Sequence, residues 1–181
     1  ELIAASLNNN LLAEELSPSV SRLEREICFW LANKIGFGQK SGGVAASGGT
    51  LNNLNALITA RFISGHQNDP KASFVVSKDA HSSFKKCIRI LGLSDENLIE
   101  VETDNNGCMN LDSLEHQIQL NLNSGKKIFA IVATLGTTMR GAIDPIKAIS
   151  RICKDRNIWL HIDGSIGGVF SIFRNKIIDK C

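Results

Sequence analysis

The 181-residue sequence lacks the features that mark several large classes of protein. Its 20 Lys and Arg residues nearly balance its 18 Asp and Glu residues, and no basic run exceeds a pair of lysines, so nothing favours a nucleic-acid partner. No apolar run approaches the roughly 18 residues of a membrane span, and no signal-peptide pattern is present. We therefore expect a cytoplasmic protein without a membrane partner.

Metal and disulfide signatures are also missing. The five cysteines form no Cys-x-x-Cys pair and are odd in number, which predicts free thiols in a reducing compartment. The histidines lack the spacing of metal ligands, so we predict no metal site. These residues are Cys28, Cys87, Cys108, Cys153 and Cys181, and His66, His81, His116 and His161.

Both ends of the sequence look incomplete, because it opens "ELIAASLNNN" without a methionine and closes on "RNKIIDKC" without a cap or stop signal. The length suits one domain with a substantial core. We expect a helical segment at 1–38 that leads into an α/β domain at 39–181.

The chain alternates strand-like and helix-like segments, which is typical of a parallel sheet with helices on both faces. Capping signals are expected at Ser17-Pro18, Asp112-Ser-Leu-Glu115 and Asp144-Pro145. The patterns predict strands at 42–50 (with a turn), 72–77, 97–103, 127–134 and 158–163, and helices at 18–35, 51–64, 81–92, 112–122 and 145–156.

Polar and small residues follow several of these strands. Because the carboxyl ends of parallel strands share one edge of the sheet, we expect them to form a site there. They are 47–50 ("SGGT"), 79–81 ("DAH"), 134–138 and Asp163.

The "SGGT" stretch lies between a strand and a helix. Its glycines allow close backbone approach, and the following helix N-terminus and the Thr50 hydroxyl suit a phosphate group. It is neither a P-loop nor Gly-x-Gly-x-x-Gly, and the alternative is a turn that needs positive φ.

His81 and Asp163 supply groups for a flat ring. His81 stands where an imidazole can stack on a ring or act as a base, unless it merely bonds its neighbours. Asp163 follows a buried strand with no basic residue near it in sequence, and burying an unpaired carboxylate is costly. A distant cation, a bound cationic ligand or a cap of the next turn would each account for it. His161, two residues earlier, points to the same face.

One ligand needs all of these groups: a phosphate cradle, a stacking His, a hydroxyl from Thr137 or Thr138, and an Asp facing a ring nitrogen. Pyridoxal 5'-phosphate has each partner, and its protonated ring acts as an electron sink.

The sequence also resembles a known family. The segments "SGGTLNNL", "DAHSSFKKCIRILG", "DNNGCMNLDSLE", "IVATLGTTMRGAIDPI" and "WLHIDGSIGG" occur in the order found in pyridoxal-phosphate-dependent group II amino-acid decarboxylases, such as the glutamate, aromatic amino-acid and diaminobutyrate enzymes. The resemblance implies the large domain of fold type I, a three-layer α/β/α sandwich with a mainly parallel sheet. It also implies a homodimer that converts an L-amino acid to an amine and CO2.

The resemblance carries roles over to individual positions. Gly49 and Thr50 would hold the phosphate, and His81 would stack on the ring. Thr138 would lie near the ring hydroxyl or the Asp, and Asp163 would pair with the ring nitrogen.

"DGSIGG" departs from the family's "DAAxGG". Ser165 therefore takes the place of an alanine on the other face of the ring, and Ile166 that of a common aromatic residue. Asn8, Asn9 and Asn10 could approach the substrate, although a polar loop is the simpler interpretation.

The family's Schiff-base lysine has no counterpart here, since it would follow one more strand beyond Cys181. Lys85, Lys86, Lys176 and Lys180 are expected to be solvated instead, so we expect the isolated chain to be inactive. Other fold type I enzymes (a sphingoid-phosphate lyase or a cysteine desulfurase) and a non-catalytic dimerising module remain as alternatives. A Rossmann-type dehydrogenase is a weaker alternative, because the sequence lacks the glycine fingerprint of that fold.

Overall fold

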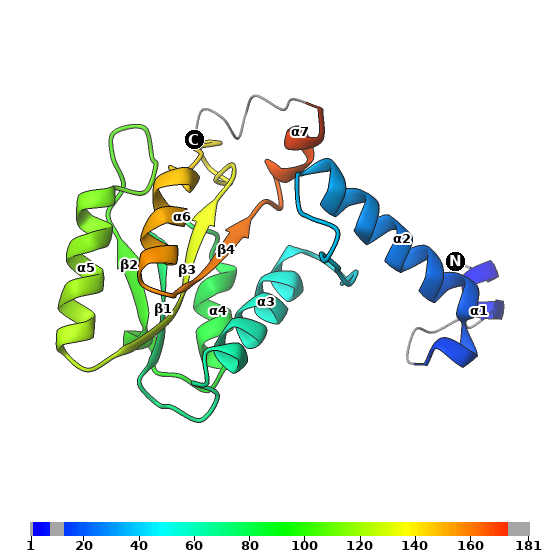
Figure 1. Cartoon of the computed structure of the whole chain (residues 1–181), viewed down its shortest axis with the longest axis horizontal. Coiled ribbons are helices and arrows are strands. Elements are labelled where there is room, and N and C mark those ends of the chain that lie inside the picture. Colours follow the sequence, from blue (N-terminus) through cyan, green and yellow to red (C-terminus); the bar gives the residue numbers. More distant parts are fainter. Residues whose placement is uncertain (1, 8–12, 174–181) are drawn as a thin grey trace. The chain divides into compact units, whose positions relative to one another are not determined.

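The computed structural model describes residues 2–7 and 13–173, and the chain forms two compact units, Glu1–Ala46 and Ser47–Cys181 (Figure 1). The first unit contains helix α1 (Leu2–Leu7), a short 3-10 helix η1 (Glu14–Leu16) and helix α2 (Pro18–Lys34). Pro18 occupies the first turn of α2, where its missing N–H costs no helical hydrogen bond. Ser17 is the N-cap residue as expected, but its side chain makes no capping bond. Asn8, Asn9 and Asn10 lie outside the described residues.

The second unit is built on a parallel sheet in the order β2-β1-β3-β4. Its strands are β1 (Ala72–Ser77), β2 (Leu98–Val101), β3 (Lys127–Thr134) and β4 (Trp159–Asp163), which confirms four predicted strands. The strand predicted at 42–50 is wrong, because 41–46 run without strand structure. These residues have few side chains that a sheet could bury, and Val44 is 70% exposed.

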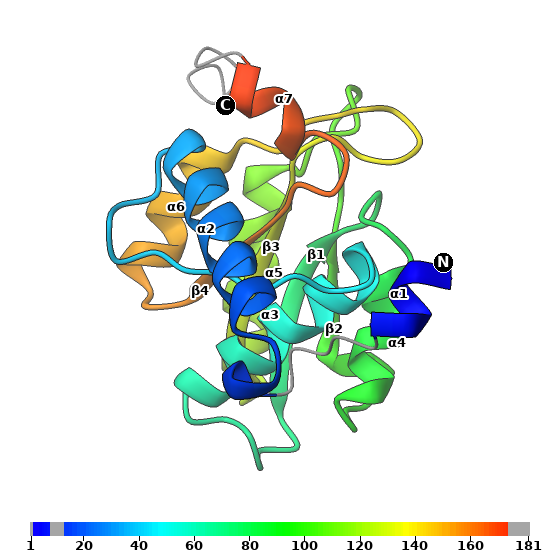
Figure 2. The same cartoon turned by 90° about the vertical axis from the view of Figure 1, so that its right-hand side faces the viewer.

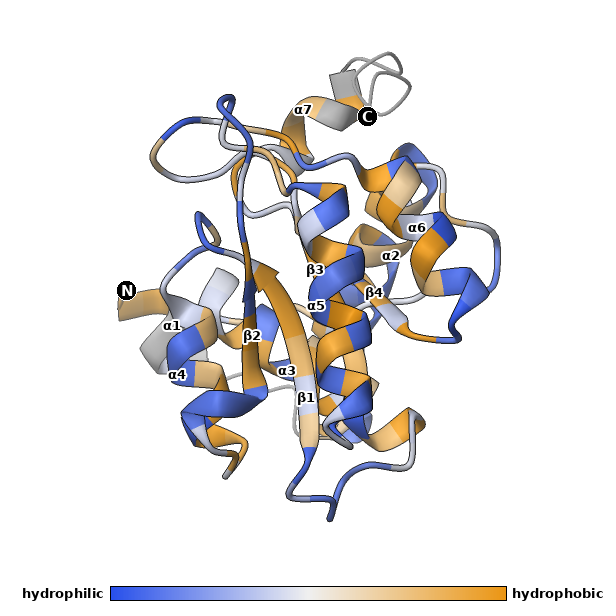
Figure 3. Ribbon diagram, turned by 90° about the vertical axis from the view of Figure 1, so that its left-hand side faces the viewer, coloured by the Kyte–Doolittle hydropathy of each residue, from blue (hydrophilic) through white to orange (hydrophobic). Residues whose placement is uncertain are grey.

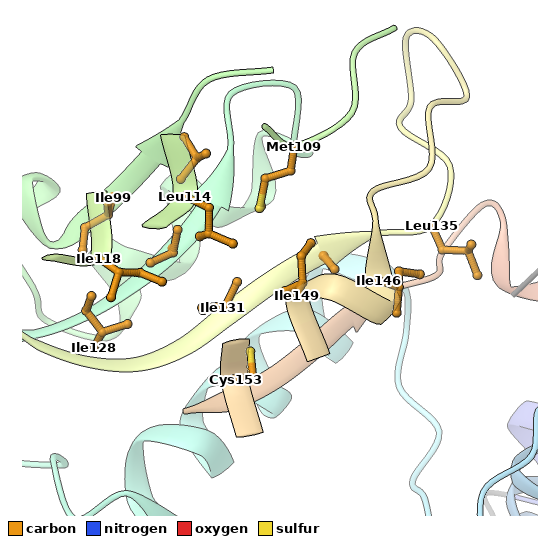
Figure 4. Close-up of a cluster of buried hydrophobic side chains, with 13 residues drawn as sticks. Ile99, Met109, Leu114, Ile118, Ile128, Ile131, Leu135, Ile146, Ile149 and Cys153 are labelled. Carbon is orange, nitrogen blue, oxygen red and sulfur yellow. The ribbon is translucent and has the colours of Figure 1, made fainter. Parts of the chain in front are cut away.

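Helices cover both faces of this sheet (Figure 2). On one face, α5 (Leu111–Asn123) and α6 (Ile146–Asp155) pack through Leu114, Ile118 and Ile149 against β1 and β3 (Figure 4). On the other, α3 (Gly49–Ile63) and α4 (Ser83–Ile90) pack through Leu57 and Phe84. The predicted three-layer α/β/α sandwich with a parallel sheet is therefore confirmed.

The burial of each strand and helix explains the hydropathy pattern of its sequence. All six residues of β1 are buried, since helices lie on both sides of it. Figure 3 shows hydrophobic residues along β1 and an alternation of hydrophobic and hydrophilic residues around α5. The short 3-10 helix η2 (Asp95–Asn97) leads into β2, and α7 (Gly168–Phe173) follows β4.

Two predicted caps are corrected by the structure. Helix α5 is capped by Asn110, whose side chain accepts a bond from the Ser113 N–H, and not by Asp112. Asp144 does not cap α6, because its carboxylate accepts hydrogen bonds from the N–H groups of Met109 and Thr134, each at 2.7 Å. Burial raises the pKa of the Asp144 carboxyl, and these two bonds oppose that rise.

No helix in the described part of the chain is long and apolar enough to cross a membrane. No disulfide joins Cys28, Cys87, Cys108 and Cys153, the cysteines within that part. Burial raises the pKa of the Cys153 thiol to about 12, and it also raises the pKa of Cys87. Both thiols are therefore apolar core groups.

Candidate cofactor site

The carboxyl edge of the sheet holds a pocket of about 270 Å³, which is close to the lower end of the roughly 300–1,000 Å³ range of small-molecule sites. All six residues predicted for the site line it, although they come from four separate segments of the chain. The lining residues are Gly49, Thr50, Asn53, His81, Thr134, Gly136, Thr138, Asp163, Ser165 and Ile166.

One end of the pocket is the N-terminus of α3. Gly48 is the N-cap residue of α3 and has a φ of 138°, which residues other than glycine rarely adopt. The interpretation of "SGGT" as a turn that needs positive φ therefore holds. It does not exclude the phosphate interpretation, because the first turn of any helix leaves N–H groups without helical partners. Gly49 and Thr50 lie at this first turn and line the pocket.

Asp163 also lines the pocket, at the end of β4. It is only 5% exposed. Its Oδ1 accepts hydrogen bonds from the Ser165 N–H at 3.1 Å and the Ser165 hydroxyl at 2.7 Å. Its Oδ2 accepts one from Asn53 Nδ2 at 3.1 Å. No ion pair to Asp163 forms within the described residues. The negative charge is thus held by neutral donors beside an open pocket.

Asn53 is the site residue that sequence reasoning missed. Its side chain contacts both Asp163 and His161, the Nε2 of which lies 2.8 Å from Asn53 Oδ1. The available signal was its position: Asn53 shares a helix face with Leu57 and Ala60, both buried, and an Asn among buried apolar residues needs a polar partner.

His81 lies just before α4, which begins at Ser83 and not at 81 as predicted. Its Nδ1 accepts a hydrogen bond from the Ser83 N–H at 3.2 Å, which orients the ring, and the exposed residue lines the pocket. The two threonines of "GTT" divide their roles. Thr137 is buried and its hydroxyl accepts from the Ala142 N–H, whereas Thr138 faces the pocket.

The described lysines stay away from this pocket. Lys85 forms an ion pair with Glu100 at 3.0 Å with its side chain 64% exposed, and Lys86 is exposed. Lys176 and Lys180 lie outside the described residues.

The residues present fit pyridoxal 5'-phosphate. Asp163 offers a buried carboxylate to a cationic ring nitrogen, and the hydroxyl of Thr134, from a residue that lines the pocket, is buried with no hydrogen-bond partner among the described residues. A buried polar group without a partner is costly, so a ligand that bonds to Thr134 would relieve that cost.

Comparison with known proteins identifies the family of the chain. The model of the pyridoxal-dependent decarboxylase conserved domain matches residues 1–177. The chain belongs to this family. Its relatives include the aromatic-L-amino-acid decarboxylase of Bacillus atrophaeus, 30% identical over 92% of this chain. The cysteine sulfinic acid decarboxylase of Rattus norvegicus is 33% identical, again over 92% of this chain.

Solved structures of the decarboxylase family share the fold. The glutamate decarboxylase domain of a Vibrio parahaemolyticus diaminobutyrate-pyruvate transaminase and L-2,4-diaminobutyrate decarboxylase superposes with a TM-score of 0.87 at 28% identity, covering 94% of this chain and 40% of that one. Mouse CSAD superposes with a TM-score of 0.86 at 32% identity, covering 94% of this chain and 37% of that one. The chain spans about a third of the length of the curated relatives, 35% of each of the two named above.

Proposed function

We propose that this chain supplies the pyridoxal 5'-phosphate-binding part of an enzyme that decarboxylates an L-amino acid to an amine and CO2. The observation that carries the proposal is the Asp163 carboxylate, buried at the pocket wall and met only by neutral donors among the described residues. A protonated ring nitrogen would form a charge-assisted hydrogen bond with it, worth on the order of 1.5–3 kcal/mol.

Each wall of the pocket has a part in this proposal. The first turn of α3, with Gly49 and Thr50, binds the phosphate. His81 stacks on one face of the ring, Ser165 lies against the other, and Thr138 lies near the ring hydroxyl or Asp163. When bound, the cofactor accepts the electrons left behind by CO2, and Asp163 holds the proton on the ring nitrogen that makes this possible.

The proposed decarboxylation also requires a lysine that carries the cofactor. We propose that this lysine belongs to a part of the protein outside this sequence, since Lys85 is committed to Glu100 and the described pocket wall contains no lysine. The chain alone should therefore show little or no decarboxylation. The complete enzyme is proposed to be a cytoplasmic homodimer.

The substrate is proposed only as an L-amino acid. Relatives named for aromatic, acidic, sulfinic and diaminobutyrate substrates match this chain at 30–33% identity, so sequence similarity favours none of these classes.

Equilibrium titration with pyridoxal 5'-phosphate tests the proposal, with the cofactor's absorbance and its ³¹P resonance as readouts. We expect reversible binding that inorganic phosphate weakens by competition. Asp163→Ala should raise the dissociation constant at least about tenfold, because the ring nitrogen loses its charged partner. Asp112→Ala, which alters an exposed carboxylate on α5, is the matched control. Equal affinity of Asp163→Ala and the unaltered chain, or no binding by the unaltered chain, would contradict the proposal.

A further inference from the structure

We propose that Asn53 is a positioning residue, which links His161 to Asp163 by hydrogen bonds and so fixes the direction of the Asp163 carboxylate at the pocket. The inference rests on the proposed function, because it assigns Asn53 a part in holding the cofactor's ring.

The contacts define a continuous polar chain across two elements. Nε2 of His161, in the middle of β4, lies 2.8 Å from Oδ1 of Asn53. Nδ2 of Asn53 donates to Oδ2 of Asp163 at 3.1 Å. Asn53 is only 4% exposed, and it projects from α3 toward the strand that carries its two partners. Helix α3 thereby contributes to the site through its first turn and through Asn53.

The Asn53 amide and the His161 imidazole each have one favoured arrangement. Burial lowers the pKa of His161, so its imidazole is neutral at pH 7 and carries one proton. Since the amide oxygen can only accept, that proton lies on Nε2. The orientation of the amide is set by Asp163, because a flipped amide would place its oxygen against a carboxylate oxygen, which can only accept. Hydrogen bonds therefore run in one direction, from His161 through Asn53 to Asp163.

Among the described residues, donors meet three of the acceptor positions of Asp163 and thereby fix its direction. A carboxylate has about four acceptor positions. Ser165 fills two of them through its N–H and its hydroxyl, and Asn53 fills a third. Rotation of the carboxylate would break all three bonds, so the remaining position keeps one direction. Asp163 lines the pocket, and a protonated ring nitrogen is the donor proposed to take that position.

The first experiment measures the His161 tautomer by ¹⁵N NMR in the chain without cofactor. The Nε2–H form should dominate in the unaltered chain. Asn53→Leu removes the acceptor and should yield a mixture of tautomers. Asn53→Asp keeps an acceptor of the same size and should retain the Nε2–H form. An Asn53→Leu chain with the tautomer population of the unaltered chain would overturn the inference.

The second experiment measures binding of ¹⁵N-labelled pyridoxal 5'-phosphate, with the ring-nitrogen shift as the report of its protonation. Asn53→Leu should weaken binding about tenfold and shift the ring nitrogen toward its unprotonated value, because it removes the donor to Asp163. A role in packing alone would leave the protonation of the bound ring unchanged. Asn53→Leu chains that protonate the bound ring normally would therefore overturn the inference.

Asn52 provides matched controls, since it is the adjacent asparagine on α3 and is exposed. Asn52→Leu and Asn52→Asp should leave both readouts unchanged. The two proposals fail in different ways. If the unaltered chain does not bind the cofactor, the proposed function is wrong, and the His161 tautomers of the two Asn53 variants then decide the inference.

Discussion

Gly49 and Ser165 lie so close together that a Cβ on Gly49 would come within 2.6 Å of the Ser165 hydroxyl oxygen. That hydroxyl is the one that donates to Asp163 at 2.7 Å. The first turn of α3 can therefore pack against the loop after β4 only because residue 49 has no side chain. The proposed phosphate end and the proposed nitrogen end of the pocket share this contact.

Gly49→Ala should displace the Ser165 hydroxyl from Asp163 and weaken the binding of pyridoxal 5'-phosphate. Because the obstructing atom is the end of a side chain, removing it should restore part of the loss. The double variant Gly49→Ala/Ser165→Ala is therefore expected to bind better than the sum of the two single changes predicts, with a coupling of about 0.5–3 kcal/mol. Titration of the three variants measures this coupling, and strict additivity would contradict it.

Gly167 makes an even closer approach to backbone. A Cβ there would lie 2.1 Å from the carbonyl oxygen of Leu135, which also accepts the Gly167 N–H at 2.9 Å. Gly167→Ala must therefore separate the two loops at the pocket edge, at a cost of roughly 1–3 kcal/mol in the free energy of unfolding or more. Urea denaturation measures that cost.

The control for this change is the next residue. A Cβ on Gly168 would meet nothing within 4 Å, so Gly168→Ala at the start of α7 should cost little. Equal stabilities of the Gly167→Ala and Gly168→Ala chains would disprove the steric argument.

Sequence patterns predicted strands correctly where nearly every residue of the strand is buried. The runs 72–77 and 127–134 are apolar on both faces because helices cover both sides of β1 and β3, so composition alone indicates a strand. The residues at 42–46 are small without being strongly apolar. Whether such a segment joins a sheet depends on a partner strand, which local sequence does not specify.

The site was predicted as a set of residues but not as a hydrogen-bond network. The carboxyl edge of a parallel sheet brings Thr138 and Asp163 together whatever their partners, so topology sufficed to predict the pocket lining. Asn53 and Asp163 are 110 positions apart, and their contact depends on how α3 packs on β4. The role of Asp144 could not be predicted from local sequence either. It precedes a proline, as a helix cap often does, but its carboxylate accepts hydrogen bonds from backbone N–H groups that are distant in sequence.

Acid should destabilise the fold partly through His161. Burial lowers its pKa in the folded state, whereas the unfolded value is about 6.5. As the pH falls below about 6.5, the unfolded chain therefore binds a proton that the folded chain does not yet bind, and the free energy of unfolding decreases down to the folded pKa. Above that window the histidine is neutral in both states and contributes no slope.

His161→Gln tests this contribution, because glutamine can still donate to Asn53 but does not titrate. Urea midpoints measured from pH 8 to pH 5 should fall less steeply for His161→Gln than for the unaltered chain. Every other titrating group is common to both chains, so the difference in slope reports His161. Parallel curves would contradict the assignment.

Asp144 should contribute more to stability than any exposed carboxylate, because it satisfies two N–H groups on different segments. Its side chain accepts from Thr134, at the end of β3, and from Met109, in the loop before α5, and all three residues are buried. Asp144→Ala leaves both N–H groups buried without an acceptor, at roughly 1–3 kcal/mol for each. Asp144→Asn keeps one acceptor but turns its NH₂ toward the other N–H, so it should also be destabilising.

Urea denaturation of the two Asp144 variants measures that cost against Asp112→Ala, whose exposed carboxylate in the first turn of α5 is worth less than about 1 kcal/mol. Thr134 lines the pocket, so loss of the Asp144 contact should also weaken cofactor binding in proportion to the displacement of the β3 end. An Asp144→Asn chain as stable as the Asp112→Ala chain would mean that the two N–H groups find other acceptors, and that the carboxylate is not what joins β3 to the loop before α5.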